Sequence, residues 1–230
     1  MPKLVEHAAR RRDVADAVIR LVRQRGVDQV TVRSVAVEAG WSTGVLSHYF
    51  RDKDALLVAA FERVTERVTR RVTEQLRGDG VPLAVLERVL AEMLPVDATR
   101  RDEAVAWFGF VGYALARPAL ASVQRRAYAD WREVVRDILD AARTAGDLGP
   151  GLDPVREAVA LVGFVDGLAL QALCDPEHFP PVRQLAALAD KVGGLAGPTA
   201  RPTARSEAPG SDHDNQTGRT RSGWNGRPPG

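Results

Sequence analysis

The chain has 230 residues, of which 45% are hydrophobic and 27% charged, a composition typical of a globular protein with room for a small domain and a larger one. Its single cysteine, Cys174, excludes an intramolecular disulfide and a cysteine-cluster metal site, and this usage indicates a reducing, cytoplasmic environment. No apolar segment precedes the basic run that begins at Arg10, so no secretory signal is expected.

The net charge of +2 is unevenly distributed along the chain. Residues 1–75 carry 14 Lys and Arg against 10 Asp and Glu, whereas residues 76–196 carry 13 against 17. A basic N-terminal part can neutralise phosphates, which supply most of the non-specific affinity of proteins for DNA. Because charge runs are usually only solvated faces, the asymmetry favours DNA binding without establishing it.

The first predicted element is an amphipathic helix from about Ala8 to Arg25, preceded by a mobile arm over residues 1–7. Gly26 follows it as a C-terminal cap. The apolar residues on one side of this helix are Val14, Ala17, Val18, Leu21 and Val22.

Two short helices that meet at a sharp turn are predicted over residues 31–50. Thr31 suits the N-cap of the first helix, and Gly40 suits the left-handed conformation that ends it. Ser42 then suits the N-cap of a second helix over about residues 43–49. Helices with so short a link cross steeply, which is the geometry of a helix-turn-helix, whose second helix lies in the DNA major groove.

The second of these helices is predicted to present a small polar face to DNA. Small residues let a helix backbone approach the bases, and hydroxyl groups can bond base edges or phosphates. Arg33 is the one long donor nearby, and Lys53 is placed for a contact with the DNA backbone. An ordinary helical hairpin with a solvated face is the alternative. The outward residues are Thr43, Gly44, Ser47 and His48, and the expected inward residues are Val45, Leu46 and Phe50.

The run TVRSVAVEAGWSTGVLSHYFRDKDALL, residues 31–57, resembles the DNA-binding segment of the TetR family of bacterial transcriptional regulators. Trp41 and Ser47 depart from the family pattern, and Ser47 replaces a tyrosine that usually contacts DNA. The matching positions are Thr31, Val35, Ala36, Ala39, Gly40, Ser42, Gly44, Leu46, Tyr49, Phe50, Lys53 and Leu56. The expected DNA-binding residues are therefore Thr31, Arg33, Ser42, Thr43, Gly44, Ser47, His48, Tyr49 and Lys53.

The resemblance implies an all-α protein with two domains. A three-helix DNA-binding domain with the helix-turn-helix is expected over residues 8–68, and a helical ligand-binding and dimerisation domain over residues 69–196. Such a regulator is expected to be a homodimeric repressor that binds a palindromic operator in double-stranded DNA and responds to a small-molecule effector. A helical adaptor that binds protein and has lost specific DNA recognition is the alternative.

The periodicity beyond Lys53 predicts helices only. A long helix from Lys53 to about Arg77 starts in the DNA-binding core and enters the second domain, so it is expected to couple the two. Further helices are predicted over residues 83–94, 101–116, 118–145, 153–174 and 181–195. The window Ala158 to Cys174 is the most apolar, but it is interrupted by Asp166 and Gln171 and judged too short for a membrane span, so no membrane partner is expected.

The helix over residues 153–174 is apolar nearly all round, which indicates cover on more than one side. A two-fold interface with a second copy is the preferred interpretation, and burial within one chain is the alternative.

Aromatic and polar residues of the second domain are candidates for a ligand pocket between helices. Plain core packing is the alternative for the aromatic residues, and dimer contacts or buried hydrogen bonding for the polar ones. The segment over residues 163–179 also resembles the BetI-like branch of the TetR family, some members of which respond to choline-type cations. The candidates are Trp107, Phe108, Phe110, Tyr113, Trp131, Phe164, Asp166 and Gln171.

Enzymatic motifs are missing from the sequence. The four histidines are scattered, no glycine-rich phosphate loop or nucleophile elbow appears, and neither a cofactor nor a metal is expected. From Gly197 onward the composition changes to small and polar residues that cannot bury a core, which predicts a disordered tail over residues 197–230.

Overall fold

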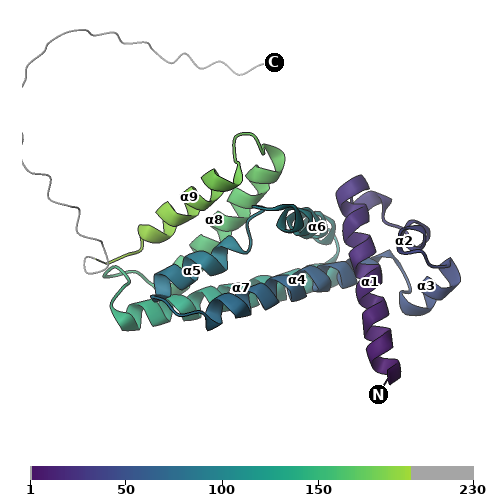
Figure 1. Cartoon of the computed structure of the whole chain (residues 1–230), viewed down its shortest axis with the longest axis horizontal. Coiled ribbons are helices and arrows are strands. Elements are labelled where there is room, and N and C mark those ends of the chain that lie inside the picture. Colours follow the sequence, from purple (N-terminus) through teal and green to yellow (C-terminus); the bar gives the residue numbers. More distant parts are fainter. Residues whose placement is uncertain (1, 198–230) are drawn as a thin grey trace, which may run out of the picture.

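The computed structural model describes residues 2–197, and their secondary structure is helical throughout apart from one isolated bridge between Leu148 and Ala196 (Figure 1). The all-α prediction is confirmed. Apart from Gly197, the predicted tail lies outside the described residues. The elements are α1 (Pro2–Arg25), η1 (Val27–Gln29), α2 (Val32–Ala39), α3 (Thr43–Tyr49), α4 (Lys53–Arg77), α5 (Pro82–Ala91), α6 (Ala98–Ala114), α7 (Pro118–Ala145), α8 (Pro154–Cys174) and α9 (Pro181–Gly193).

Local capping produces the helix-turn-helix that the sequence predicts. The Thr31 side chain accepts a hydrogen bond from the Ser34 amide and so caps α2. Gly40 ends that helix in the left-handed region, with φ 71°, where a residue with a Cβ would be strained. The Ser42 side chain accepts from the Val45 amide and begins α3. These three residues set where α2 ends and α3 begins through contacts within four positions of themselves.

One hydrophobic core joins α1 to α4 and continues into α6. Val18, Leu21, Val35, Leu46 and Phe50 are all buried in it, as expected. The core also takes in residues of α6, so the DNA-binding helices share their interior with the following domain. Those α6 residues are Ala106, Trp107, Phe110 and Ala114.

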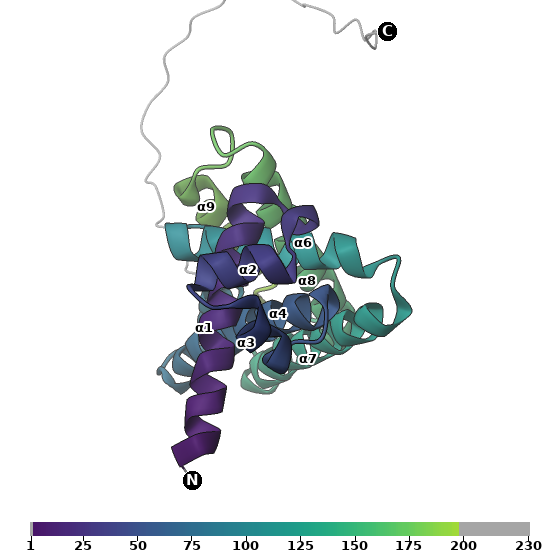
Figure 2. The ribbon, with the colours of Figure 1, turned by 90° about the vertical axis from the view of Figure 1, so that its right-hand side faces the viewer.

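Two predictions about these helices are wrong. Val45 is 45% exposed, because Leu46 and Phe50 already fill the space beneath so short a helix. The first helix begins at Pro2 and not at Ala8, and its first turns project past α3 (Figure 2). Proline suits this position because its missing amide hydrogen is not needed in a first turn.

A second core lies within the remaining helices. Helix α7 packs against α5 and α8, α9 covers α5, and the far end of α4 enters this core at Val72 (Figure 1). Helix α6 lies between the two cores, where it contacts α1, α4, α7 and α8.

The α8 helix has 21 residues and a mean hydropathy of 1.6, so within the described residues it is the one helix long and apolar enough to cross a membrane. The prediction that this segment is too short to span a membrane is therefore wrong. Its packing is that of a core helix, because Leu161, Val165 and Leu168 are buried against neighbouring helices. Its other face is exposed, and α9 also exposes large apolar side chains. The exposed large apolar residues of the two helices, termed the α8/α9 face, are Val155, Val159, Leu170, Val182 and Leu185.

Candidate DNA-binding surface and ligand cavity

The outer face of α3 is small, polar and exposed. All four residues predicted to face DNA are exposed, and so is Arg33 on α2. Thr31 and Ser42 are also exposed, but their side chains accept hydrogen bonds from backbone amides as caps. Their contribution to the surface is thus to orient the two helices. A surface of this kind can approach base edges closely, with Arg33 as the long donor beside it.

Tyr49 and Lys53 lie at the edge of this surface and are held by other parts of the chain. The Tyr49 ring lies 4.6 Å from the ring of His7, between ring centroids, and the Arg10 guanidinium donates to its hydroxyl at 3.4 Å. Lys53 Nζ donates to the carbonyl oxygen of Asp28 at 3.2 Å and lies 5.1 Å from the centre of the Tyr113 ring. Neither side chain points freely away from the protein.

A cavity of about 280 Å³ lies between α4, α6, α7 and α8. Four of the eight predicted pocket residues line it, namely Trp107, Phe108, Trp131 and Asp166. Aliphatic side chains of α4 and α7 complete the apolar wall, including Val64, Val68, Val72 and Val134. Its charged residues are Glu92, Arg100, Glu103, Asp130 and Asp166.

The other four predicted pocket residues lie elsewhere. Phe110 is buried and stacks on Phe61 at 4.4 Å between ring centroids, so it belongs to the first core. Tyr113 reaches the start of α4, where its hydroxyl donates to Asp54 at 2.9 Å. Phe164 packs against the second core, and exposed Gln171 donates to the carbonyl oxygen of Gly167. The fold distributes these residues over different faces because α6 and α8 each contact several neighbours.

Asp166 is a desolvated carboxyl group with no basic side chain at ion-pair distance within residues 7–197. Burial raises its pKa, and a hydrogen bond with the Tyr128 hydroxyl opposes that rise. Burial likewise raises the pKa of Tyr128. The buried Trp107 indole nitrogen also lies close to the Tyr128 hydroxyl. This part of the cavity therefore offers one acceptor with a poorly compensated charge beside aromatic rings.

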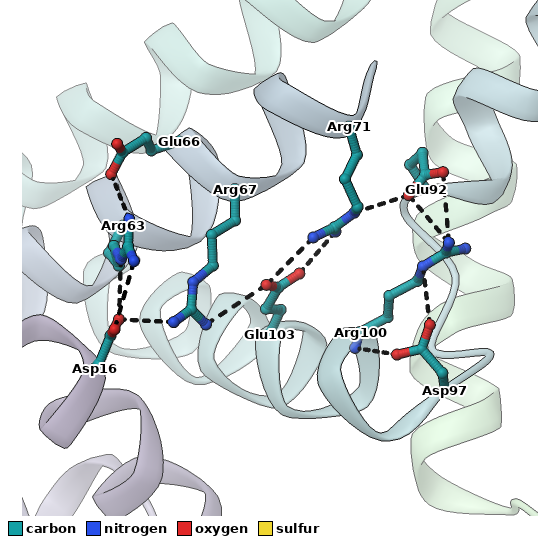
Figure 3. Close-up of polar contacts among 9 residues, drawn as sticks. All are labelled: Asp16, Arg63, Glu66, Arg67, Arg71, Glu92, Asp97, Arg100 and Glu103. Carbon is teal, nitrogen blue, oxygen red and sulfur yellow. Dashed lines mark hydrogen bonds and ion pairs between the residues drawn. The ribbon is translucent and has the colours of Figure 1, made fainter. Parts of the chain in front are cut away.

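Three lining residues of the cavity, Glu92, Arg100 and Glu103, belong to a chain of ion pairs along α4 (Figure 3). Arg63, Arg67 and Arg71 recur every four residues, so they lie on one face of the helix. Asp16 of α1 accepts from Arg63 at 3.0 Å and pairs with Arg67 at 2.9 Å. This carboxylate ties the DNA-binding part to the first half of the arginine series.

Glu103 and Glu92 continue the chain into the second domain. Glu103 of α6 lies 2.7 Å from Arg71 and 3.6 Å from Arg67. Glu92, just after α5, lies 2.8 Å from Arg71 and 3.3 Å from Arg100. Burial opposes the charge of Arg71, but hydrogen bonds and charges from both glutamates outweigh it and raise the pKa of the guanidinium.

The sequence analysis did not predict these ion pairs, although the arginine spacing that indicates them is present in the sequence. Three arginines at four-residue spacing repel one another on an isolated helix, so they require carboxylates from elsewhere. Both glutamates are almost fully buried, and removing one partner of such a pair typically costs about 3–5 kcal/mol. The ion pairs thus connect Asp16 of α1 without a break to Glu103, Glu92 and Arg100 in the cavity wall.

Comparison with known proteins identifies both parts of the chain. Residues 14–60 match the family model of bacterial regulatory proteins of the tetR family, and residues 82–197 match that of the BetI-type transcriptional repressor, C-terminal. The HTH-type transcriptional regulator PksA of Bacillus subtilis (strain 168) is 33% identical over 176 residues, which cover 76% of this chain and 84% of PksA.

Solved structures agree with the described architecture. A transcriptional regulator from Rhodococcus sp. Rha1 has a TM-score of 0.72 at 29% identity, covering 80% of this chain and 95% of that one. A transcriptional regulator from Saccharomonospora viridis in complex with choline has a TM-score of 0.76 at 22% identity, covering 82% and 98%. The second likeness shows the fold alone.

Proposed function

Because the chain belongs to the tetR family of bacterial regulatory proteins, we propose that it is a homodimeric repressor that a small-molecule effector releases from its operator. The families and relatives that match are transcriptional regulators and not enzymes. The observation that carries the proposal is the exposed polar face of α3, with Arg33 beside it and a cavity connected to α1 through α4. Its DNA partner would place the protein in the cytoplasm.

The exposed α8/α9 face supports the dimer. Val155, Val159, Gly163 and Leu170 recur at helical spacing on α8, and all four are exposed in the single chain. A row of exposed apolar side chains along a helix is typical of an interaction site, and a second copy would supply a matching surface by two-fold symmetry. Two copies would present their α3 helices to successive major grooves, about 34–36 Å apart, on a palindromic operator.

The cavity supports an organic cation as the effector. Four of its five charged lining residues are carboxylates, and Asp166 among them lacks a basic partner within the described chain. Trp107 and Trp131 supply aromatic faces, which attract cations. The related fold from Saccharomonospora viridis was solved with choline, and choline is therefore the first probe for this cavity.

Release from DNA requires that the effector bind one conformation better than the other. Glu92, Arg100 and Glu103 belong both to the cavity wall and to the ion-pair chain along α4. A cation at this wall would compete with the arginines for Glu92 and Glu103. Weaker ion pairs would change the position of α4 and hence the distance between the two α3 helices of the dimer. The differential affinity for the two conformations sets how far DNA binding can be weakened.

The proposal is tested by fluorescence anisotropy on duplexes tiled across the DNA that flanks the gene, with random DNA as competitor. A saturable complex on one pseudo-palindromic tile is expected, and added choline is expected to dissociate it. Arg33→Ala should cost about 1–3 kcal/mol and relax specificity if Arg33 reads a base. Arg143→Ala, at the far end of α7, is the matched control and should leave binding unchanged.

Each part of the proposal can fail separately in this experiment. An equal loss on all sequences would make Arg33 a phosphate contact. A complex that choline tightens would contradict release by this cation and leave DNA binding intact. Binding no better than to random DNA on every tile, and in a genome-wide selection of bound fragments, would contradict the regulator and favour the adaptor.

A further inference from the structure

Tyr113 lies where the end of α6 meets the beginning of α4, whereas the sequence analysis placed it among the candidate pocket residues. It lies in the last turn of α6, and its hydroxyl donates to Asp54 in the first turn of α4 at 2.9 Å. Its ring has Lys53 on one side at 5.1 Å and Arg117 at 3.6 Å, measured to the ring centre. Both distances fall within the range of cation–π attraction. The end of α6 is therefore fastened to the beginning of α4.

The same contacts hold Lys53 against the protein. Its ammonium donates to the carbonyl oxygen of Asp28 at 3.2 Å while it rests against the Tyr113 ring, and its side chain is half-buried. Lys53 is the first residue of α4, four residues after the end of α3, at the edge of the DNA-binding surface. The ammonium has three N–H donors and gives one to this carbonyl, but contact with the ring keeps it against the protein, so it has to leave the ring to reach a phosphate.

We infer that Tyr113 is a positioning residue that holds Lys53 away from the DNA backbone. The position of α6 relative to α4 thereby sets how many phosphates the protein contacts. This goes beyond the proposed function, because it concerns a protein residue outside both the α3 face and the cavity. It requires only that the protein bind DNA, and it holds whatever the effector is.

Helix α6 is placed to connect this junction to the cavity. Gly109 and Tyr113 are four residues apart and so share one side of the helix, whereas Ala104, Trp107 and Phe108 line the cavity from the other sides. The Gly109 side is packed closely, since a Cβ placed there would lie 2.8 Å from a Val27 methyl group. Because this side of α6 is so closely packed, a shift of the helix that starts at the cavity would also displace Tyr113 relative to Lys53.

The test measures the affinity of the full-length protein for a random-sequence duplex as a function of KCl concentration, by anisotropy. Neutralising one phosphate lowers the slope of log K against log salt by about 0.9, which at 0.1 M salt corresponds to roughly eightfold tighter binding. Tyr113→Leu removes the ring and is therefore expected, for each subunit that contacts the DNA, to steepen the slope by about 0.9 and to tighten binding at 0.1 M salt roughly eightfold. Tyr113→Phe keeps the ring over Lys53 and should restore the wild-type slope.

A double-mutant cycle separates this role from a structural one. In a Lys53→Gln background, Tyr113→Leu should no longer tighten binding, because no ammonium is left to release. In a Lys191→Gln background, which removes a lysine of α9 instead, the full effect should persist. Thermal unfolding of every variant checks that each is folded at the assay temperature.

Three outcomes would overturn the inference. These are weaker binding by Tyr113→Leu, an unchanged salt slope, and an effect of equal size with and without Lys53. Each would mean that Tyr113 merely packs at the junction. None of them bears on operator recognition by α3, which is measured on specific duplexes, so this inference and the proposed function fail independently.

Discussion

At the scale of single residues, the partner of a buried carboxylate decides its chemistry. Glu92 and Glu103 are almost fully buried, and each pairs with the Arg71 guanidinium at 2.7–2.8 Å. Asp166 is desolvated in the same cavity without such a partner, so the pKa of its carboxyl group lies above the ordinary value of 3.8. The carboxylates that line one cavity therefore differ in how strongly they attract an added cation.

Asp166→Asn is expected to change how stability depends on pH. A carboxyl group with a raised folded-state pKa contributes stability below its ordinary pKa and loses that contribution as pH rises through the folded-state value. The asparagine variant should therefore gain free energy of unfolding relative to wild type between about pH 4 and pH 7. Urea unfolding at both pH values measures the difference.

Tyr128→Phe is the matched variant, and it should change the pH dependence of stability in the opposite direction. Its hydroxyl favours the ionised form of Asp166, so its removal should raise the pKa further and make the wild-type fall in stability steeper. Parallel pH profiles for wild type and Asp166→Asn would contradict the assignment of this carboxyl group as desolvated.

At the scale of elements, α6 is the helix on which both parts of the molecule depend. Its N-terminal half supplies Glu103 to the arginines of α4, and its C-terminal half joins the core of the DNA-binding helices through Phe110 and Ala114. Helix α4 is correspondingly tied at its first turn by Tyr113 and along one face by the ion pairs. A change in either helix has to be accommodated by the other.

Gly109→Ala is expected to destabilise the protein by about 1–3 kcal/mol, as overpacking does. The added methyl group would meet Val27, whose branched side chain cannot turn aside easily, and α6 would have to move away from η1. Gly112→Ala is the matched control on the same helix, because nothing lies within 4 Å of a Cβ placed there.

Gly109→Ala should therefore lower the free energy of unfolding, whereas Gly112→Ala should not. Gly112→Ala should be neutral or stabilising by up to about 1 kcal/mol, since alanine favours helix. Guanidinium unfolding compares the two. Equal effects would show that α6 does not approach η1 as closely as described.

At the scale of the whole molecule, the exposed α8/α9 face distinguishes one chain from the proposed dimer. A chain with Val155, Val159 and Val182 all more than half exposed has a strong hydrophobic reason to associate. Two copies are also what the proposed palindromic operator would need, since each α3 would read one half-site.

Val159→Glu is expected to convert the dimer to a monomer and to weaken operator binding at the same protein concentration. Val159 is 55% exposed in the single chain, so the fold should tolerate the carboxylate while the interface does not. Sedimentation velocity measures the mass, and anisotropy measures the binding. Val81→Glu, an equally exposed valine before α5, is the control, with 61% exposure and no place on the α8/α9 face.

The sequence by itself determined the features that depend on near neighbours. Thr31, Gly40 and Ser42 act on residues within four positions of themselves, so the helix-turn-helix and the bounds of α3 could be predicted from capping rules. Helical periodicity over longer stretches likewise predicted an all-α chain and the long helix α4. The family resemblance, carried by this same local segment, agrees with the matched family.

The tertiary structure alone decided which side chains meet. Asp16 and Arg63 are 47 residues apart in sequence, Arg71 and Glu103 are 32 apart, and Asp54 and Tyr113 are 59 apart. Composition and spacing could gather Trp107, Phe110 and Tyr113 as candidate pocket residues, but not assign one to the cavity, one to the core and one to the α4 junction. That division follows from the packing of α6 between two cores, because each side of a helix meets whichever element the whole fold brings to it.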